Sequence, residues 1–310
     1  MLSRCLTLSL FLSAAWLVVA GTPARGVDGD SAATSARTVS RKNERRATPV
    51  RWLDNYGRAM AEAEKQGRML LIDFFDPQGD DACRRFESET LSDPQVRKQL
   101  RRYVCLRLPV SAKIKMRGKD AVLLEQDAFE EMHGKPGIAV VDFRSRRAPL
   151  RGAVVSMFPI TDRLDYSPEQ MAVILDLPRG TLTQRTLIFA VRTHPEKPAS
   201  TDGEPLPDLL EEAESHSQYQ ASIQVQGHHF WDTRFGRIIA RLPGGLGARE
   251  VCAESWPGDN LVEAAVECVR SWRQSSGHWN AVSSEHPFFG YDMKRGQNGV
   301  WYATGIFGGG

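Results

Sequence analysis

Two groups of side chains in this 310-residue sequence have the chemistry to bind or to react. The first group consists of thiols, at Cys5, Cys83, Cys105, Cys252 and Cys268. The second consists of imidazole and carboxylate groups in the C-terminal half, among them His228, Glu254 and His278. Thiols form disulfides or act as nucleophiles, depending on the compartment and on their pKa. Imidazole and carboxylate groups are suitable zinc ligands. The elements around these residues decide which chemistry the chain can use.

The N-terminus has the pattern of an export signal. Arg4 precedes an apolar run over residues 5–20, and Val18 and Ala20 place small residues at the −3 and −1 positions before Gly21. These are the parts of a secretory signal peptide over residues 1–20. A membrane anchor is the alternative, but the run is shorter than the roughly 20 apolar residues of a typical span. No later segment is apolar enough to cross a bilayer. We therefore expect a secreted or periplasmic protein with no membrane span in the mature chain.

Export also determines how the cysteines are interpreted. Cleavage removes Cys5 and leaves four cysteines, an even number that permits two disulfides in an oxidising compartment. They fall two in each half of the chain, so the simplest connectivity joins Cys83 to Cys105 and Cys252 to Cys268. The alternative for the first pair leaves Cys83 as a free thiol that could react.

Composition and charge exclude one class of partner. Hydrophobic residues make up 41% and charged residues 25% of the chain, which is ordinary for soluble protein and sufficient for two cores. The net charge of +2 is too small for a nucleic-acid-binding protein, and no Lys/Arg patch is interleaved with aromatic residues. Residues 21–48 are rich in Ser, Thr, Ala, Gly and Arg and have almost nothing to bury, so they are predicted to be a disordered linker.

Residues 50–178 alternate between helical and strand patterns. Short continuous apolar runs, as expected for buried strands, lie at residues 69–75, 103–108, 137–143 and 153–158. Segments with helical patterns lie at residues 54–66, 81–90 and 120–132. This alternation predicts an α/β domain with a central sheet.

The order of these elements resembles the thioredoxin fold. The resemblance covers MLLIDFF, a helix that carries Cys83, YVCLRL and GKPGIAVVDF, and it implies that Pro136 is the cis-proline of that fold. Thioredoxins carry Cys-x-x-Cys at the start of the first of these helices, but the window here reads Asp80-Asp81-Ala82-Cys83. The attacking cysteine is replaced by Asp80, and acidic neighbours raise the pKa of a thiol. We therefore expect a thioredoxin-like domain that is redox-inert.

Residues 181–308 contain helical patterns followed by a terminal hairpin. Helices are predicted at residues 182–192, 207–222 and 259–274, and paired strands at residues 287–293 and 300–307. One face of the second helix is expected to carry Leu209, Leu210, Ala213, Ser217 and Ala221. The buried side of the third is expected to carry Val262, Ala265, Val266, Val269 and Trp272.

Four short motifs in this framework resemble the CAP superfamily in its bacterial SCP-domain form. They are Ala213 with His216-Ser217, Gly227-His228 followed by Arg234, Ala253-Glu254-Ser255, and Trp272 leading into Ser275, Gly277 and His278. The segments FFGYDM and WYATGIFG are similar to the last two strands of the family. The resemblance implies an α+β domain, a CAP-type α-β-α sandwich, over residues 181–308.

In that family two histidines and one or two acids line a cavity that can hold a divalent metal. The resemblance assigns these positions to His228, Glu254 and His278, and His229 could replace His228. Imidazole and carboxylate donors suit zinc. The family's second acid has no counterpart between Trp272 and His278, so the site has three protein residues. Each of the three could instead be a surface or capping residue.

The two halves together favour a binding or interaction protein over an enzyme. The expected partner is a small-molecule or lipid ligand or a component of the cell envelope. One alternative is a metal-dependent hydrolase with Glu254 as general base, or with Ser275 or Ser276 as nucleophile. Another is a protein that reacts through the single thiol of Cys83.

Overall fold

A computed structural model describes residues 49–309 apart from residues 117 and 147. The predicted signal peptide, residues 1–20, and the predicted linker, residues 21–48, lie outside the described residues. Contacts between the described residues group Pro49–Gly310 into one compact unit, which contains two separate main sheets. No helix in the described part of the chain is both long enough and apolar enough to cross a membrane.

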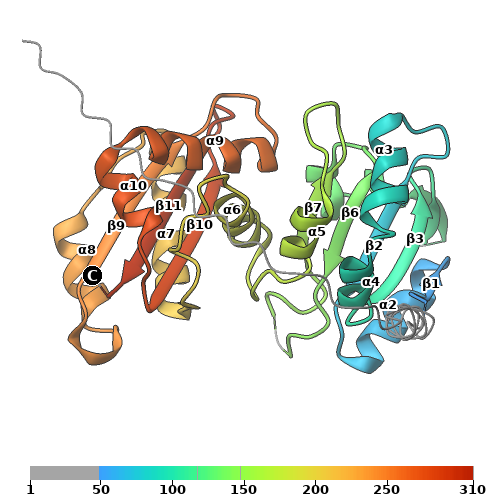
Figure 1. Ribbon diagram of the computed structural model, residues 1–310, viewed down its shortest axis with the longest axis horizontal. Helices are drawn as coiled ribbons and strands as arrows, with labels where there is room; N and C mark the ends of the chain where they lie inside the picture. The colour runs from blue at the N-terminus through green and yellow to red at the C-terminus, as the bar shows by residue number, and fades with distance from the viewer. Residues whose placement is uncertain (1–48, 117, 147, 310) are drawn as a thin grey trace, which may run out of the picture. The chain divides into compact units, whose positions relative to one another are not determined.

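The first sheet has five strands in the order β1-β3-β2-β6-β7 (Figure 1). Its strands are β1 (Trp52–Leu53), β2 (Leu70–Phe75), β3 (Val104–Pro109), β6 (Gly137–Val141) and β7 (Val154–Pro159). Strands β1, β3 and β2 run parallel, whereas β6 and β7 pair antiparallel. The surrounding helices are α2 (Tyr56–Gln66), α3 (Asp81–Arg85), a π-helix η1 (Phe86–Thr90), α4 (Pro94–Leu100) and α5 (Pro168–Ile174). The α/β domain predicted from the alternation of patterns is therefore confirmed.

Both faces of this sheet are buried, which explains the continuous apolar runs in its sequence. In β2, Leu71 belongs to one core cluster, whereas Leu70, Ile72 and Phe74 belong to the other. Successive side chains of a strand point to opposite faces, so a strand covered on both sides must be apolar throughout. Asp73 is the exception within β2, and it is 2% exposed.

Two expectations for this half were wrong. The helix predicted over residues 120–132 is instead a hairpin of β4 (Lys113–Met116) and β5 (Lys119–Val122), followed by two 3-10 helices, η2 (Leu123–Glu125) and η3 (Asp127–Met132). Phe129 has a non-helical φ of −118°, which prevents one continuous helix here. Among the described residues the cis peptide bond joins Ala148 to Pro149, so Pro136 is not the cis-proline. The chain after Pro136 instead uses Gly137 at a φ of 139°, where a Cβ would lie 2.2 Å from the Phe158 carbonyl oxygen.

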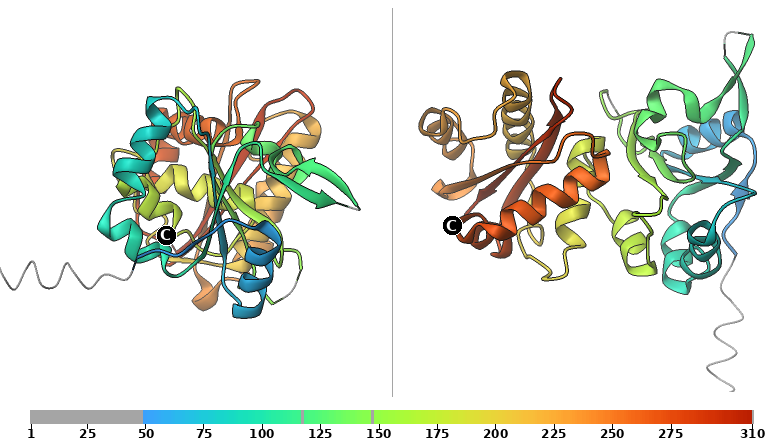
Figure 2. Two further views of the ribbon diagram at one scale, coloured as in Figure 1. Left: turned by 90° about the vertical axis from the view of Figure 1, so that its right-hand side faces the viewer. Right: turned by 90° about the horizontal axis from the view of Figure 1, so that it is seen from above.

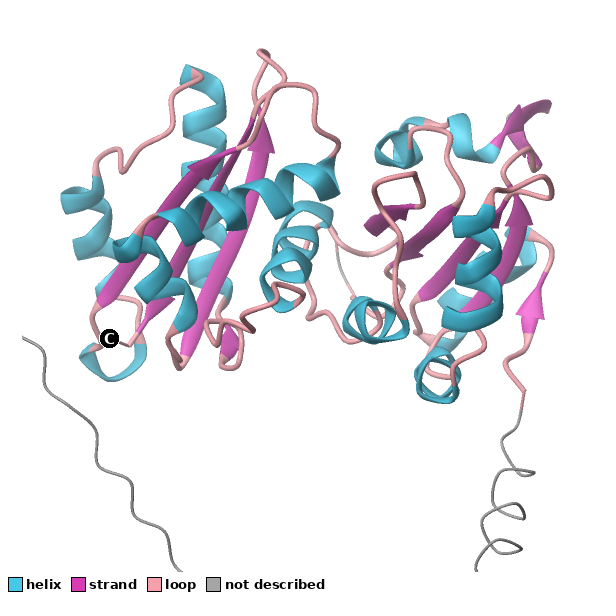
Figure 3. Cartoon of the chain, turned by 45° about the horizontal axis from the view of Figure 1, so that its top comes forward, coloured by secondary structure: helices cyan, strands magenta, loops and turns pink. Residues whose placement is uncertain are grey.

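The second sheet has four strands in the order β8-β10-β11-β9 (Figure 3). Its strands are β8 (Glu204–Pro205), β9 (Ala248–Glu254), β10 (Phe288–Arg295) and β11 (Trp301–Gly308). Strands β10 and β11 form the antiparallel hairpin that the sequence predicted. The helices of this half are α6 (Leu182–Arg192), α7 (Pro207–Ile223), α8 (Trp231–Ile239), η4 (Pro243–Gly245), α9 (Leu261–Gln274) and α10 (Ser276–Ser283).

Helices cover both faces of the second sheet (Figure 2). Val251 and Ala253 of β9 belong to the core cluster that contains residues of α6 and α9. Ile306 of β11 belongs instead to a cluster with Leu209 of α7 and Ile238 of α8. The layers are therefore helix, sheet and helix, with β9 at an edge that has only β11 as a partner.

Helix α7 lies unusually close to β10, and its position fixes the site described below. A Cβ added at Gly290 would be 2.2 Å from the carbonyl carbon of Leu209, so only glycine permits this approach. Ser217 donates hydrogen bonds to the carbonyl oxygens of Ala213, at 2.8 Å, and of Asp292, at 2.9 Å. The buried face expected for α7 is present, with Leu210 only half-buried. For α9 the expectation was wrong at Val266, which is 48% exposed.

Candidate metal centre

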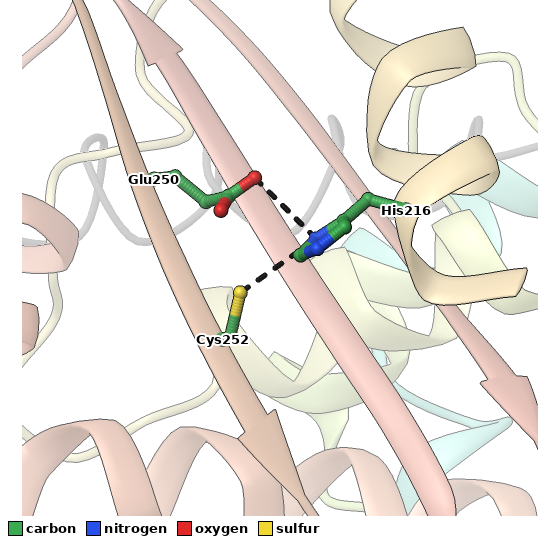
Figure 4. A group of neighbouring side chains, drawn as sticks. All are labelled: His216, Glu250 and Cys252. Atoms are coloured by element: carbon green, nitrogen blue, oxygen red, sulfur yellow. Dashed lines mark hydrogen bonds and ion pairs between the residues drawn. The ribbon is translucent and has the colours of Figure 1, made fainter. Parts of the chain in front are cut away.

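Three side chains that can ligate a metal meet on the α7 face of the second sheet. Glu250 and Cys252 are two residues apart on β9, so their side chains point to the same side. His216 of α7 faces them, with its Nδ1 3.4 Å from Glu250 Oε2 and 3.8 Å from Cys252 Sγ (Figure 4). The donor atoms of the three residues all lie within 4.8 Å of one another. They form a buried group that could hold a metal ion.

A fourth donor, His228, comes from the loop before α8. Its Nδ1 lies 3.0 Å from Glu250 Oε1 and 3.7 Å from Cys252 Sγ. Its other ring nitrogen, Nε2, lies 3.3 Å from Nε2 of His278 on α10. The loop is held by Gln220 of α7, whose Oε1 accepts a hydrogen bond of 3.1 Å from the backbone N–H of Gly227. His228 therefore connects the buried group to the half-exposed ring of His278.

Helix α8 contributes a cation to the same group. Arg234 is 7% exposed, and its Nη2 lies 2.5 Å from Glu250 Oε2. The helix is fixed to α7 by Arg237, whose Nε and Nη2 each donate to the Glu212 carboxylate at 2.6 Å. A carboxylate buried in this way is stable because cationic and hydrogen-bonding partners replace its lost water.

Burial and these partners set the protonation of the group. Burial alone raises the pKa of Glu250, but hydrogen bonds from His228 and Arg234 outweigh it, so the pKa ends below its ordinary value. Burial lowers the pKa of His216 to about 4. Burial, together with the Glu250 charge, raises the pKa of the Cys252 thiol well above its ordinary value. At neutral pH the group therefore contains one carboxylate, a neutral imidazole and a neutral thiol.

The spacing and chemistry of these donors fit a tetrahedral metal. Zinc bonds of about 2.0–2.3 Å place neighbouring donors of a tetrahedral shell roughly 3.3–3.8 Å apart. The donor atoms of His216, Glu250 and Cys252 all lie within 4.8 Å of one another, and His228 Nδ1 lies 3.0 Å from Glu250 Oε1 and 3.7 Å from Cys252 Sγ. The ring nitrogen of His216 that faces Glu250 and Cys252 is Nδ1, which also lies 3.2 Å from Thr304 Oγ1. The donor set, with one sulfur, two imidazoles and one carboxylate, is typical of zinc rather than of magnesium or calcium.

The three residues named from the sequence are not all brought together. His228 and His278 are neighbours, 3.3 Å apart at their Nε2 atoms. Glu254 is exposed at the C-terminal end of β9, opposite Tyr302 on β11. The acid that contacts His228 is Glu250, four residues earlier on the same strand and about 13 Å away along it. Glu254 is the last residue of β9.

Other residues weighed from the sequence have structural contacts. The ring of His229 packs 5.4 Å from that of Tyr219, and its Nε2 lies 3.2 Å from the carbonyl oxygen of Val225. Ser275 is the N-cap of α10, where its hydroxyl accepts from the backbone N–H of His278. A capping hydroxyl of this kind is engaged with the backbone.

The expected disulfides are absent among the described residues, where Cys83, Cys105, Cys252 and Cys268 are all free. Cys252 lies on the α7 face of the sheet, whereas Cys268 lies on α9, which packs on the opposite face. The sheet between them separates the two thiols. The sequence signal that identifies the site is the alternation Glu250-x-Cys252 on one strand face, together with His216 of the A-x-x-H-S motif.

The first half of the chain carries a thiol in a different setting. Asp80 is the N-cap of α3 and accepts a hydrogen bond of 3.0 Å from the backbone N–H of Cys83. Burial, together with the charges of Asp80 and Asp76, raises the pKa of the Cys83 thiol to about 11. The expectation that acidic neighbours raise this pKa is confirmed. The thiol is therefore protonated at neutral pH and a poor nucleophile.

Comparison with known proteins bears on this first half only. Residues 51–142 match the model of a family described as thioredoxin-like. No curated protein matches the chain. The matched segment contains strands β1 to β6 and the Asp80–Cys83 window described above. Residues 51–142 of this chain are accordingly a thioredoxin-like domain.

Proposed function

We propose that this chain is an exported, non-catalytic binding protein whose second half is a CAP-type domain that binds one zinc ion. The ligands are His216, His228, Glu250 and Cys252. The observation that carries the proposal is that donor atoms of His216 on α7 and of Glu250 and Cys252 on β9 all lie within 4.8 Å of one another, and that His228, in the loop before α8, contacts both Glu250 and Cys252. Bound there, zinc would link the three segments.

Donor chemistry supports zinc over the more abundant hard cations. A thiol and two imidazoles are unsuitable for magnesium and calcium, which take oxygen ligands. The pKa of the Cys252 thiol is raised by burial, and a coordinating cation deprotonates such a thiol outright. Loading should therefore release a proton and depend on pH.

The same contacts favour binding over catalysis. Structural zinc sites are filled by four protein ligands, whereas catalytic sites keep a position open for water. Oε2 of Glu250 pairs with Arg234, and Oε1, which contacts His228, is the oxygen left to ligate the zinc ion. A general base needs a free oxygen near the water that it deprotonates. Glu250 is therefore assigned to ligation and positioning, and Glu254 lies outside the group.

Support for the CAP-type assignment comes from the layers and from the motif residues. The second sheet lies between helices on both faces, as in an α-β-α sandwich. His216 and Ser217 of the A-x-x-H-S motif are buried against the sheet, and the chain closes on the antiparallel pair β10 and β11. Export is proposed on the signal-peptide pattern of residues 1–20. A buried Cys252 thiol is compatible with an oxidising compartment because water and oxidants do not reach it.

Zinc competition with a chromophoric chelator, on reduced and metal-stripped full chain, tests the proposal. We expect one equivalent of zinc to bind. Cys252→Ala should lower the affinity for zinc by more than the roughly 10- to 100-fold loss that follows when a residue that supports a ligand, rather than a ligand itself, is replaced. Cys268→Ala is the matched control, because Cys268 is also a buried free thiol but lies on the opposite face of the sheet.

Cobalt substitution gives a second readout, which reports directly whether a thiolate is a ligand. Thiolate-to-cobalt charge-transfer absorbance should appear in the wild-type chain and in Cys268→Ala, and should be missing in Cys252→Ala. If the wild-type chain failed to compete with the chelator for zinc, or if both variants retained the absorbance, the proposed site would be wrong.

A further inference from the structure

A cavity that is remote in sequence from the proposed zinc ligands is lined by arginines. It has a volume of about 570 Å³ and lies where the start of β2, the start of β3 and the segment after α5 meet. Its lining includes Arg68, Arg102, Arg144 and Arg179, with Asp176 as the only carboxylate. Cavities of this size accommodate small organic ligands.

Residues 175–178 form one wall of this cavity, and each of their backbone carbonyl oxygens accepts a hydrogen bond from the protein. The wall therefore has no free carbonyl oxygen that would repel an anion. The Leu175 carbonyl accepts from Tyr103 Oη at 2.9 Å and from Arg102 Nη2 at 3.1 Å. The Asp176 carbonyl accepts from Arg192 Nη1 at 3.3 Å. The next two carbonyls, of Leu177 and Pro178, accept from Arg185 Nη1 at 3.0 and 2.7 Å. Four successive backbone acceptors are thus neutralised by donors of the protein.

The arginines of the lining differ in whether their guanidinium groups already donate to acceptors of the protein. Arg68 is committed, because it donates to the carbonyl oxygens of Arg102 and Tyr103. Arg144 is exposed, and its guanidinium has no partner among the described residues. Arg179 is also exposed, and its contact in the described part of the chain is a hydrogen bond of 2.9 Å from Nη2 to Ser145 Oγ. Arg144 and Arg179 therefore keep most of their donors for a ligand.

The buried side chain behind this wall, Arg185, is also positively charged, like the arginines of the lining. Arg185 is fully buried, and its Nη2 has no hydrogen-bond acceptor among the described residues. The buried acid Asp142 attracts Arg185 electrostatically, but its oxygens accept hydrogen bonds from the backbone N–H groups of Arg144 and Ser145 and from Ser145 Oγ rather than from Arg185. A desolvated cation with incomplete compensation leaves a positive potential that nearby anions feel strongly.

We propose that this cavity is a binding site for a small phosphorylated ligand, with Arg144 and Arg179 as the direct donors to its phosphate group. Arginine presents several N–H donors in a planar fork that matches phosphate oxygens, and such charge-assisted hydrogen bonds are the stronger kind. Arg102 is held in place by Asp176, with both of its Nη atoms 3.3 Å from Asp176 Oδ1. Free phosphate and phosphate esters share the chemistry that the site recognises.

Titration calorimetry of the full chain with pyrophosphate and with inorganic phosphate, in low-salt buffer without metal, tests this proposal. We expect saturable binding of one pyrophosphate, weakened as salt is added. The double variant Arg144→Gln/Arg179→Gln should lose at least tenfold in affinity. Arg58→Gln is the matched control, because Arg58 is an exposed arginine of α2 that does not line the cavity.

A gain of affinity provides the sharper test. Asp176→Asn removes the one carboxylate of the lining while keeping an oxygen that can accept from Arg102, so it should tighten pyrophosphate binding several-fold. Thermal unfolding of each variant establishes that it is folded. The proposal is overturned if wild-type chain shows no saturable heat. It is also overturned if the double variant binds like Arg58→Gln, or if Asp176→Asn leaves the affinity unchanged.

Discussion

Two buried carboxylates, Asp73 and Glu250, show that partners decide whether a buried charge is tolerated. Glu250 has His228 on one oxygen and Arg234 on the other, and its pKa is lowered. Asp73 has one ion-pair partner, Arg107, whose Nε is 3.1 Å from Oδ2, and this is too little to offset burial. Burial therefore raises the pKa of Asp73 to about 7. The first carboxylate is built to stay charged, whereas the second gains a proton under mild conditions.

Asp73→Asn should reveal this difference as a pH-dependent change in stability. The pKa of Asp73 in the folded chain, about 7, lies above the ordinary value of 3.8, so between these values the folded state binds the extra proton. The wild-type chain therefore loses stability through this group as pH rises from about 4 to about 7. The variant has no such group, so its stability relative to wild type should increase by a few kcal/mol over that interval.

Chemical denaturation at pH 4 and at pH 8 measures that increase. Asp120→Asn, on the β4–β5 hairpin, is the control, since an exposed carboxylate remains solvated in both states. A constant difference between Asp73→Asn and wild type across this range would show that Asp73 is ionised in the folded chain throughout.

At the scale of elements, the zinc ligands depend on how closely α7 lies on the sheet. His216 reaches Cys252 and Glu250 only because the helix backbone approaches β10 at Gly290. The helix has no side-chain N-cap hydrogen bond, so its packing against the sheet and the Ser217 hydrogen bonds fix its position. The metal ligands are thus held by backbone proximity rather than by local helix preference.

Gly290→Ala should consequently weaken both the fold and zinc binding. The added Cβ would lie 2.2 Å from the Leu209 carbonyl carbon, a backbone atom that cannot rotate away. Overpacking of this kind lowers the free energy of unfolding by about 1–3 kcal/mol or more. A shift of α7 would also move His216 away from the other donors. Gly236→Ala in α8 is the matched control, because its Cβ meets nothing within 4 Å and alanine favours helix. Equal stabilities for the two variants in urea denaturation would refute the argument.

Helices and strands are predicted more accurately from the sequence where a single hydrophobic periodicity, helical or strand-like, dominates the segment. The residue range of α6 was predicted as observed, and the β10–β11 pair was predicted within two residues. The helix predicted over residues 120–132 was wrong, because local turns at Gly118 and Phe129 outweigh its pattern. The pairing of His228 with His278 was anticipated by motif, whereas His216, Glu250 and Cys252 were not predicted as donors of the site. Which acid of β9 meets a histidine depends on strand register, and motif spacing does not define that register.

For the molecule as a whole, α6 contacts residues of both main sheets. Arg185 donates from Nε to Ser156 of β7 at 2.8 Å, and Thr183 donates to Asp292 of β10 at 2.5 Å. Phe189 of the same helix packs on Phe158 of β7, with ring centroids 4.7 Å apart. One helix thus contributes to the cores of both sheets, and the cooperativity of unfolding should depend on it.

Arg185→Met tests that dependence, because methionine retains much of the side-chain length but donates no hydrogen bonds. Loss of the Arg185 guanidinium leaves Ser156 Oγ and the carbonyl oxygens of Leu177 and Pro178 without their donor. Each buried acceptor left unsatisfied costs about 1–3 kcal/mol. Removal of a buried cation offsets part of that cost. We expect a net loss of a few kcal/mol and, because α6 joins both cores, a single transition shared by two probes. Fluorescence of Trp52 in the first sheet and of Trp301 in the second can be separated by replacing the other tryptophans with phenylalanine. Two separate wild-type transitions would show that the sheets unfold independently despite α6.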